Sequence, residues 1–278
     1  MQRRLPDWLT IQSGDGKAIA ETRRCIQEFS LHTVCEEAKC PNIQRCFEKK
    51  RATFLLLGNF CTRSCGFCNI GHAEHPEEPK KSEPETVAQA CEALHLEHIV
   101  LTMVTRDDLP DGGALHVAKT IAAVKKRLPQ ATVEVLVSDF QGNENALKVV
   151  LEAGPDILGH NLETVQRLTP RIRSKATFER SISVLKTIKQ IKPKQVIKSG
   201  IMVGFGESLQ EVLETLLVLS QIPVDIVTVG QYLQPSPKHL QVARWVPPEE
   251  FQEYEKEGKR LGIKKIASGP FVRSSFVD

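Results

Sequence analysis

The chain has 278 residues, of which 41% are hydrophobic and 26% charged, and its formal net charge is +3. This is the composition of an ordinary globular protein with enough apolar material for a sizeable core. The small net charge and the 5% of aromatic residues exclude a basic or base-stacking nucleic-acid surface. Because no apolar run approaches the ~18 residues of a membrane span, we expect neither a nucleic acid nor a membrane as partner.

The N-terminal third begins with a polar segment, MQRRLPDWLTIQSGDG, which lacks the apolar core of a secretory signal. We therefore expect a cytoplasmic, reducing location, where clustered cysteines bind metal more often than they form disulfides. Apolar residues near one face predict a helix over 17–29. The first cysteine group, Cys35, Cys40 and Cys46, follows with the spacing C-x4-C-x5-C, and its Lys-Cys-Pro-Asn core, residues 39–42, is a predicted loop.

The second cysteine group follows a predicted strand in the sequence. The compact apolar run 52–57 ends at a glycine, which is typical of a buried strand. Cys61, Cys65 and Cys68 come directly after it with the spacing C-x3-C-x2-C. A connector rich in proline and glutamate follows over 76–84.

Helices and strands then alternate regularly. The patterns predict helices over 85–96, 114–128, 143–153, 178–191, 207–221 and 248–261, and strands over 98–104, 132–137, 156–158, 195–203 and 225–229. A short segment around Ile266 leads to the tail. With the strand at 52–57, six strands are each followed by a helix, which favours parallel pairing through right-handed crossovers. Six βα units are two short of a full barrel. The predicted fold is therefore α/β, a partial (βα)6 TIM-type barrel.

This fold divides the chain into three expected parts. Residues 1–50 form an N-terminal extension with the first cysteine group, 51–262 form the partial barrel, and 263–278 form a C-terminal segment. Polar motifs such as TRDDLPDGG, SDFQGN, HNLET, GFGES and QYLQPS stand where predicted strands end. Since the carboxyl ends of parallel strands share one edge, where such folds build their sites, we expect these motifs to gather near the second cysteine group.

Each cysteine group is one ligand short of a complete set of four. Thiolates favour zinc or iron–sulfur clusters over magnesium or calcium. A structural zinc site closes with four Cys or His ligands, and His72 or His75 is the candidate that would complete one here. Three cysteines on a cubic four-iron cluster instead leave one iron open to a small molecule, and this is the interpretation that we favour.

Several segments carry a family resemblance. CTRSCGFCNI resembles the signature of radical S-adenosylmethionine (SAM) enzymes, and CEEAKCPNIQRC resembles the auxiliary-cluster motif of lipoyl synthases. TMVTRDDLPDGGA, HNLETV, IKSGIMVGFGE and ASGPFVRSSF also look like that family, so the resemblance covers roughly residues 25–276. It implies a sulfurtransferase with two 4Fe–4S clusters and SAM, which inserts sulfur at C6 and C8 of a protein-bound octanoyl group to form the lipoyl group.

The resemblance also implies different roles for the two cysteine groups. The reduced cluster on the second group cleaves SAM to a 5′-deoxyadenosyl radical, which removes hydrogen from the octanoyl chain. The auxiliary cluster on the first group is consumed as the sulfur donor. Its fourth ligand would be a serine oxygen near the C-terminus, from Ser275 or from Ser274, with Ser275 slightly favoured.

By the same resemblance, residues at strand ends bind SAM. They are Thr102, Arg106, Asp107, Asn161, Glu163, Arg173, Lys198, Gly204 and Gly206. Structural roles remain the alternative, because the charged residues among them also suit ion pairs and the polar loop residues suit helix caps. The remaining cysteines, Cys25 and Cys91, lie on apolar helix faces, and we expect them to pack in the core.

The resemblance implies protein partners as well. These are octanoylated lipoyl carrier domains of 2-oxoacid dehydrogenase E2 subunits and of the glycine cleavage H protein, reduced ferredoxin or flavodoxin as electron donor, and an iron–sulfur carrier that rebuilds the auxiliary cluster. The alternatives are another two-cluster radical SAM enzyme, a two-zinc interaction module and a two-cluster electron carrier. The last two classes do not need six βα units, and ferredoxins usually complete each cluster with a fourth cysteine.

Overall fold

One curved sheet dominates the computed structural model, which describes residues 5–10 and 15–275. Residues 1–4, 11–14 and 276–278, at the ends of the predicted extension and tail, lie outside the described residues. In spatial order the strands are β1 (His32–Thr33), β2 (Thr53–Leu56), β5 (His98–Met103), β6 (Thr132–Leu136), β7 (Ile157–Gly159), β8 (Val196–Val203), β9 (Ile226–Gln231) and β10 (Lys265–Gly269). From β2 to β10 all neighbours are parallel, whereas β1 runs antiparallel to β2. In the described chain β1 and β10 are the two edge strands of this sheet and do not pair with each other, so the barrel is partial and open.

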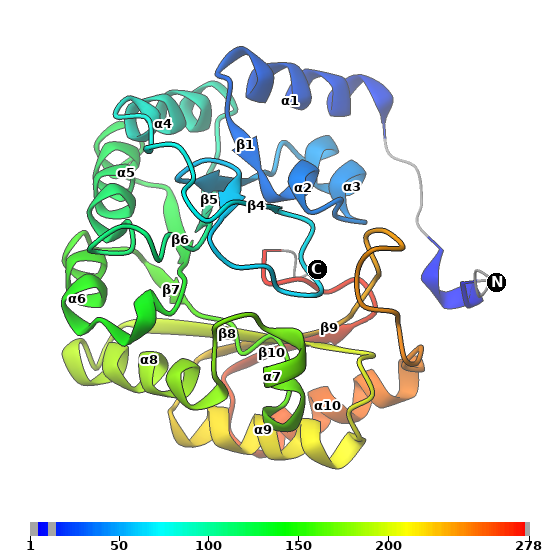
Figure 1. Cartoon of the computed structure of the whole chain (residues 1–278). Helices are drawn as coiled ribbons and strands as arrows, with labels where there is room; N and C mark the ends of the chain where they lie inside the picture. The colour runs from blue at the N-terminus through cyan, green and yellow to red at the C-terminus, as the bar shows by residue number, and fades with distance from the viewer. Residues whose placement is uncertain (1–4, 11–14, 276–278) are drawn as a thin grey trace.

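The long helices cover the outer, convex face of this sheet, whereas the helices of only four to six residues do not (Figure 1). The helices are α1 (Gly16–Glu28), α2 (Val34–Glu37), α3 (Ile43–Glu48), α4 (Glu83–Ala93), α5 (Ala114–Arg127), α6 (Glu144–Glu152), α7 (Thr169–Ile172), α8 (Phe178–Ile191), α9 (Leu209–Gln221) and α10 (Pro248–Arg260). Short 3₁₀ turns are η1 (Asp7–Leu9), η2 (Phe140–Gly142) and η3 (Gln166–Leu168), and a small second sheet pairs β3 (Phe60–Cys61) with β4 (Gly71–His72). No helix in the described part of the chain is both long and apolar enough to span a bilayer.

The predicted alternation of strands and helices is confirmed, and two features differ from the prediction. The segment around Ile266 is a seventh parallel strand, β10, paired with β9. The predicted loop over residues 39–42 is present, but two short helices that were not predicted, α2 and α3, flank it. Neither helix is long enough to show a helical period in the sequence. The side chain of Thr33, which accepts a hydrogen bond from the Glu36 N–H, begins α2.

The core lies between the sheet and the outer helices, and α8 illustrates how a helix joins it. The Thr177 side chain accepts a hydrogen bond from the Arg180 N–H and thereby caps the first turn. Val184, Leu185 and Ile188, at helical spacing, are then buried against the sheet. The opposite face of α8 stays polar and exposed, which places this helix on the outside of the barrel.

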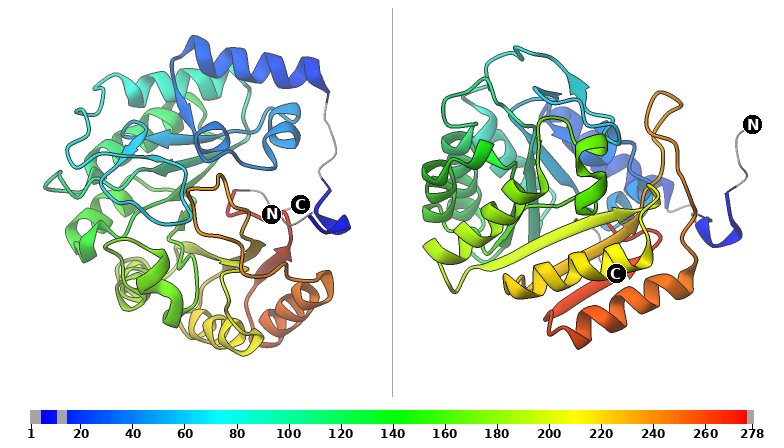
Figure 2. Two further views of the ribbon diagram at one scale, coloured as in Figure 1. Left: turned by 45° about the vertical axis from the view of Figure 1, so that its right-hand side comes forward. Right: turned by 60° about the horizontal axis from the view of Figure 1, so that its bottom comes forward.

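Three segments that are far apart in the sequence gather on the inner side of the sheet. Figures 1 and 2 show the loop 57–82 in cyan, the segment 233–247 in orange and the tail after β10 in red on this side. The Leu240 N–H donates to the Gly66 carbonyl at 3.0 Å, so the first two segments touch. The inner side therefore carries the second cysteine group, the segment after β9 and the chain terminus together.

Candidate active site at the carboxyl ends of the strands

A cavity of about 470 Å³ lies on the inner side of the sheet. Its lining includes Cys40 of the first cysteine group, all three cysteines of the second group and residues 273–275 of the tail. Strand residues such as Val100 and Thr228 line it from the sheet. The predicted gathering of strand-end motifs around the second cysteine group is present for SDFQGN, HNLET and QYLQPS but not for GFGES, and Cys40 and the tail join it.

The second cysteine group sits in a loop that neighbouring segments hold closely. Cys61 ends β3, and the Gly66 N–H donates to the Ile172 carbonyl at 3.0 Å. A Cβ atom at Gly66 would lie 2.8 Å from the Leu240 side chain, so this close approach requires glycine. Burial raises the pKa of Cys68 to about 12. A metal must therefore displace the thiol proton as it binds.

The first cysteine group lies at the edge of the barrel on α2 and α3. Cys35 and Cys46 are buried, whereas Cys40, between the two helices, lines the cavity. Burial raises the pKa of Cys35 to about 12, and the Thr53 N–H of β2 binds its sulfur. This contact fastens the first group to the barrel wall. The thiols of Cys40 and Cys46 are near enough to Cys35 to interact with it electrostatically.

The tail closes the space beside the first cysteine group. Asn42 Nδ2 donates to the Phe271 carbonyl at 2.7 Å, joining the first cysteine loop to a segment 229 residues later. Arg273 lies near Cys40, where its positive charge opposes the burial that raises the Cys40 pKa. The described part of the tail therefore lies beside the first cysteine group.

The two serines of the tail have different surroundings. The Ser274 hydroxyl and the Asn161 side-chain amide exchange hydrogen bonds, at 2.8 and 3.1 Å. Ser275 is exposed and lines the cavity. Ser274 is thus engaged with a predicted SAM-binding residue, while Ser275 is the more exposed of the two serines.

The arrangement of the cysteine side chains suits an iron–sulfur cluster better than a single metal ion. Among residues 5–10 and 15–275, no three Cys, His, Asp or Glu side chains converge as ligands of one metal ion. A structural zinc would require four ligands around one point. In an iron–sulfur cluster each cysteine binds a different iron, so three separated thiols on a cavity wall fit. The His72 Nδ1 lies 3.1 Å from the Cys61 carbonyl, on an exposed side chain.

Four of the predicted SAM-binding residues line the cavity: Thr102, Asn161, Glu163 and Arg173. The Thr102 hydroxyl donates to the Leu136 carbonyl at 3.0 Å. Burial raises the pKa of Glu163, and the charge of Arg173 and a hydrogen bond from Asn161 oppose that rise. The cavity therefore offers a carboxylate, an amide and a guanidinium close together, which suits a zwitterionic ligand.

Arg106 and Lys198, also predicted to bind SAM, do not line the cavity. Arg106 is 1% exposed, and its guanidinium binds the Asp108 carboxylate at 2.7 and 2.8 Å as well as three backbone carbonyls. Lys198 Nζ binds the buried Glu134 carboxylate at 2.7 Å. Buried cations require such partners. Both side chains have structural roles, the alternative that the sequence left open.

The predicted glycines Gly204 and Gly206 do not line the cavity either. Both have positive φ, 111° and 103°, and a Cβ at Gly204 would lie 2.2 Å from Gln231 Nε2. The Glu207 carboxylate accepts from the N–H groups of Gly204 and Phe205, at 2.6 and 2.9 Å. These glycines shape the turn after β8 and the approach of Gln231. Asp107 is likewise outside the cavity and binds Arg63.

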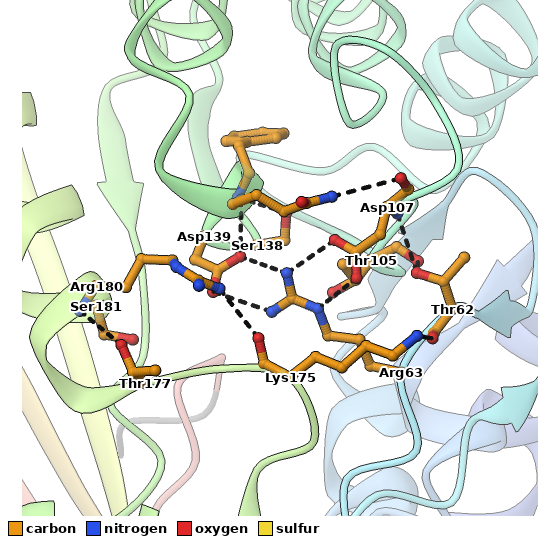
Figure 3. A network of polar contacts seen from close by, with 12 residues as sticks. Thr62, Arg63, Thr105, Asp107, Ser138, Asp139, Lys175, Thr177, Arg180 and Ser181 are labelled. Carbon is orange, nitrogen blue, oxygen red and sulfur yellow. Dashed lines mark hydrogen bonds and ion pairs between the residues drawn. The ribbon is translucent and has the colours of Figure 1, made fainter. Parts of the chain in front are cut away.

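Sequence reasoning missed three residues that line the cavity: Arg63, Asp139 and His160. The Arg63 guanidinium binds the carboxylates of Asp107 and Asp139, at the centre of Figure 3. Their motifs, CTRSC and SDFQGN, were visible as strand-end segments. No pattern in the sequence indicates that these two motifs contact each other.

His160 is held neutral inside the wall. Burial, together with the charge of Arg173, lowers its pKa to about 4. Its Nδ1 lies 2.9 Å from the Val137 carbonyl and its Nε2 3.0 Å from the Ser181 hydroxyl, which also accepts from Arg173 at 2.7 Å. A neutral ring that donates from Nδ1 and accepts at Nε2 satisfies every partner.

The remaining cysteines have no place in the cavity. Cys91, on α4, is fully buried in the hydrophobic core, and Cys25, on α1, is partly buried against that core. Both therefore lie where packing residues are expected. Two four-thiolate sites built from all eight cysteines are not what this fold presents.

Comparison with known proteins gives two kinds of likeness. The family model of the Radical SAM superfamily matches residues 55–219. A lipoyl synthase of Caldanaerobacter subterraneus subsp. tengcongensis is 50% identical over 99% of this chain and 96% of that protein. A lipoyl synthase of Protochlamydia amoebophila is 49% identical over 98% of this chain and 85% of that protein.

Solved structures resemble the fold at low identity. Streptococcus suis SuiB bound to S-adenosylmethionine has a TM-score of 0.61 and 9% identity over 82% of this chain, and the match spans about half, 53%, of SuiB. Methylornithine synthase (PylB) has a TM-score of 0.52 and 16% identity over 93% of this chain and 79% of that protein. These likenesses show the partial-barrel fold alone.

Proposed function

The chain belongs to the lipoyl synthase family within the radical SAM superfamily, and from that membership we propose how its cavity works. The chain is a sulfur-inserting enzyme that depends on an iron–sulfur cluster and on SAM. We propose that it holds two 4Fe–4S clusters, one on each cysteine group. One observation supports this most: Cys40 of the first group, all three cysteines of the second group and the tail line a single cavity.

When bound, the reduced second-group cluster with SAM supplies the radical that removes hydrogen, and the first-group cluster supplies the sulfur for C6 and C8 of the octanoyl chain. The cavity wall suits that substrate. It is largely apolar around Val100, Leu136, Ile201, Met202 and Val272. Burying an alkyl chain there is favourable by roughly 0.8 kcal/mol per CH₂, and the wall keeps water from the reacting carbons.

We assign SAM to the polar corner beside the second cysteine group. Arg173 offers its charge to the methionine carboxylate, and Glu163 with Asn161 offers acceptors to the ammonium or the ribose. The support is their position: all three line the cavity that the second group lines. Arg173 is also near enough to Cys65 to lower its pKa against burial, so this guanidinium borders the cluster loop.

We assign the fourth ligand of the first-group cluster to Ser275. It lines the cavity and is exposed, whereas the hydroxyl of Ser274 is engaged with Asn161. An alkoxide is harder than a thiolate and a poorer match to a soft iron site. We infer that this weaker ligand allows its iron to leave when a neighbouring sulfide is used.

The three parts of the chain then have separate duties. Residues 1–50 carry the expendable cluster, residues 51–262 carry SAM chemistry, and residues 263–278 close the first-group cluster. We propose octanoylated carrier domains of E2 subunits and the H protein as substrates, reduced ferredoxin or flavodoxin as donor, an iron–sulfur carrier for rebuilding, and a reducing, cytoplasmic setting for all of them.

Anaerobic reconstitution tests this function. The chain should bind about eight irons and eight sulfides, release 5′-deoxyadenosine from SAM under reduction, and convert an octanoylated carrier domain to the lipoylated form. Zinc without iron, or intact SAM after reduction, would contradict the assignment. SAM cleavage without sulfur transfer to the carrier would leave only the broader radical SAM class.

A further inference from the structure

Arg63 stands inside the second cysteine loop, two positions after Cys61, and is almost fully enclosed. Its side chain is 5% exposed. The guanidinium makes two hydrogen bonds of 2.8 Å to Asp107 and bonds of 2.6 and 3.0 Å to Asp139 (Figure 3). A planar guanidinium makes such paired contacts to two carboxylates, which a lysine ammonium does not reproduce.

These contacts fasten the start of the cysteine loop to two strand ends. Asp107 follows β5 and Asp139 follows β6. Thr62, next to Arg63, adds backbone and hydroxyl bonds of 3.0 Å to the Thr105 carbonyl, and its hydroxyl accepts the Asp107 N–H at 3.0 Å. Lys175 reaches the Thr62 carbonyl from the far side at 3.4 Å. The backbone beside Cys61 is therefore held from several directions.

Asp139 is itself held in a strained turn. The two residues after it, Phe140 and Gln141, have φ of 44° and 54°, which non-glycine residues adopt at a cost. The Gln141 N–H donates to the Asp139 carboxylate at 3.0 Å, and the Arg180 guanidinium donates to the same carboxylate at 3.3 Å. Strain of this kind persists where the surroundings fix a conformation. Here the turn holds the Asp139 carboxylate against Arg63.

The charges of this network balance. Two guanidinium groups, Arg63 and Arg180, face two carboxylates, Asp107 and Asp139, with Arg180 at the partly exposed edge. Burial would raise the pKa of Asp139, but the hydrogen bonds and charge of Arg63 lower it to about 2, so the carboxylate is ionised. Stability alone is a weak reason for such a buried network. Its position inside the cluster loop indicates a role in the reaction.

Resting on the proposed function of the second cysteine group, we propose that Arg63 is a positioning residue. It fixes the loop that carries Cys61 and, with its partners, sets the balance of charge beside the cluster that binds SAM. The backbone N–H of Arg63 donates to the Cys61 sulfur at 3.4 Å, so the main chain that the Arg63 side chain holds in place also contacts a cluster ligand. Net charge and hydrogen bonds to sulfur are what tune the potential of an iron–sulfur cluster.

Three variants separate geometry from charge. Arg63→Lys keeps the positive charge and loses the paired hydrogen bonds that the planar guanidinium makes. Asp139→Asn removes a negative charge, and Arg180→Ala removes a positive charge from a side chain that is 32% exposed, with little risk to folding. The matched control is Asp225→Asn, because that carboxylate also binds two cations, Lys189 and Lys264, and a backbone N–H, at the opposite ends of the strands.

The potential of the cluster that binds SAM, followed by its EPR signal, should move in opposite directions in two variants. It should rise in Asp139→Asn, because the lost negative charge favours the reduced cluster, and fall in Arg180→Ala. In Arg63→Lys the potential should stay near wild type while SAM cleavage slows by about tenfold, as expected for a displaced reacting group. The control should lose stability without moving the potential. A cluster potential in both Asp139→Asn and Arg180→Ala equal to that of the wild type would overturn the proposal.

Amide hydrogen exchange of the metal-free chain tests the positioning without any cluster. The Thr62 and Gly66 amides should exchange faster in Arg63→Lys than in wild type and no faster in Asp225→Asn. Unchanged exchange at both amides would contradict the role of Arg63. A wild-type chain that binds no iron would instead contradict the proposed function, so the two failures are distinguishable.

Discussion

Ser274 and Ser275 are adjacent in the chain but differ in what their hydroxyl groups meet. One is paired with Asn161 and the other faces the cavity. A side chain already engaged must break two hydrogen bonds before it binds iron, and each is worth about 1 kcal/mol. We therefore expect Ser275, rather than Ser274, to bind the iron.

This difference predicts a clear split between serine variants. Ser275→Ala should abolish sulfur insertion while SAM cleavage continues, and Ser275→Cys should bind the cluster yet insert sulfur at least tenfold more slowly, because thiolate holds iron more firmly. Ser274→Ala is the matched control and should keep most of the sulfur insertion. Product analysis by mass spectrometry measures each. A Ser275→Cys enzyme as active as wild type would contradict the weak-ligand role.

His160 predicts a pH dependence of stability. Burial lowers its pKa in the folded chain to about 4, whereas the unfolded chain takes up a proton near pH 6.5. Between these values the unfolded state binds more protons, so the free energy of unfolding falls with falling pH, by up to about 3 kcal/mol. Above about pH 6.5, His160 no longer makes the free energy of unfolding depend on pH.

Urea unfolding of the metal-free chain from pH 8 to pH 4 measures this loss. His160→Gln keeps hydrogen-bonding atoms but does not titrate, so its stability should depend less on pH across this window. The exposed His95 provides the control, and His95→Gln should follow the wild-type curve. The same pH slope in His160→Gln and wild type would show that His160 is not the group responsible.

The short elements around the first cysteine group depend on contacts over long distances in the chain. Asn42, before α3, is 2% exposed and donates to the Phe271 carbonyl beyond β10. Removing one partner of a buried hydrogen bond leaves the other unsatisfied and costs about 1–3 kcal/mol. This bond joins the tail to the first cysteine loop, so we expect its loss to displace the tail.

Asn42→Ala should therefore loosen the tail more than it destabilises the barrel. We expect faster amide exchange at Val272, a several-fold slower sulfur insertion and SAM cleavage close to wild type. Asn143→Ala removes an exposed side-chain cap of α6 on the outer face and should cost similar stability without affecting sulfur insertion. Parallel losses of both activities in Asn42→Ala would contradict a local role for this bond.

The sequence predicted the long elements well because their apolar periods extend over many residues. The limits of α8 agree with the prediction, residues 178–191. It missed β10 as a strand because its sequence, KIASG, is short and mixed in polarity, and only pairing with β9 makes it regular. The helices α2 and α3, four and six residues long, are likewise stabilised by their surroundings rather than by a visible pattern.

Over the whole molecule, the sequence showed which motifs matter but not how they meet. Spacing identified both cysteine groups. It could not reveal that Arg63 binds Asp139, 76 residues away, or that Asn161 binds Ser274, 113 residues away, because such pairs depend on how strand ends converge. For the same reason Arg106 and Lys198, polar residues near strand ends, resembled SAM ligands although the carboxylates of Asp108 and Glu134 bind them.

If this one cavity serves two clusters, as we propose, the two cysteine groups should be separable by mutation. The decisive comparison uses two triple alanine variants, one for each cysteine group, reconstituted with iron and sulfide and supplied with SAM, reductant and an octanoylated carrier domain. Each should keep about four irons. The first-group variant should release 5′-deoxyadenosine and form no lipoyl group, and the second-group variant should release none. Sulfur insertion by the first-group variant, or SAM cleavage by the second, would contradict the division of roles between the two groups.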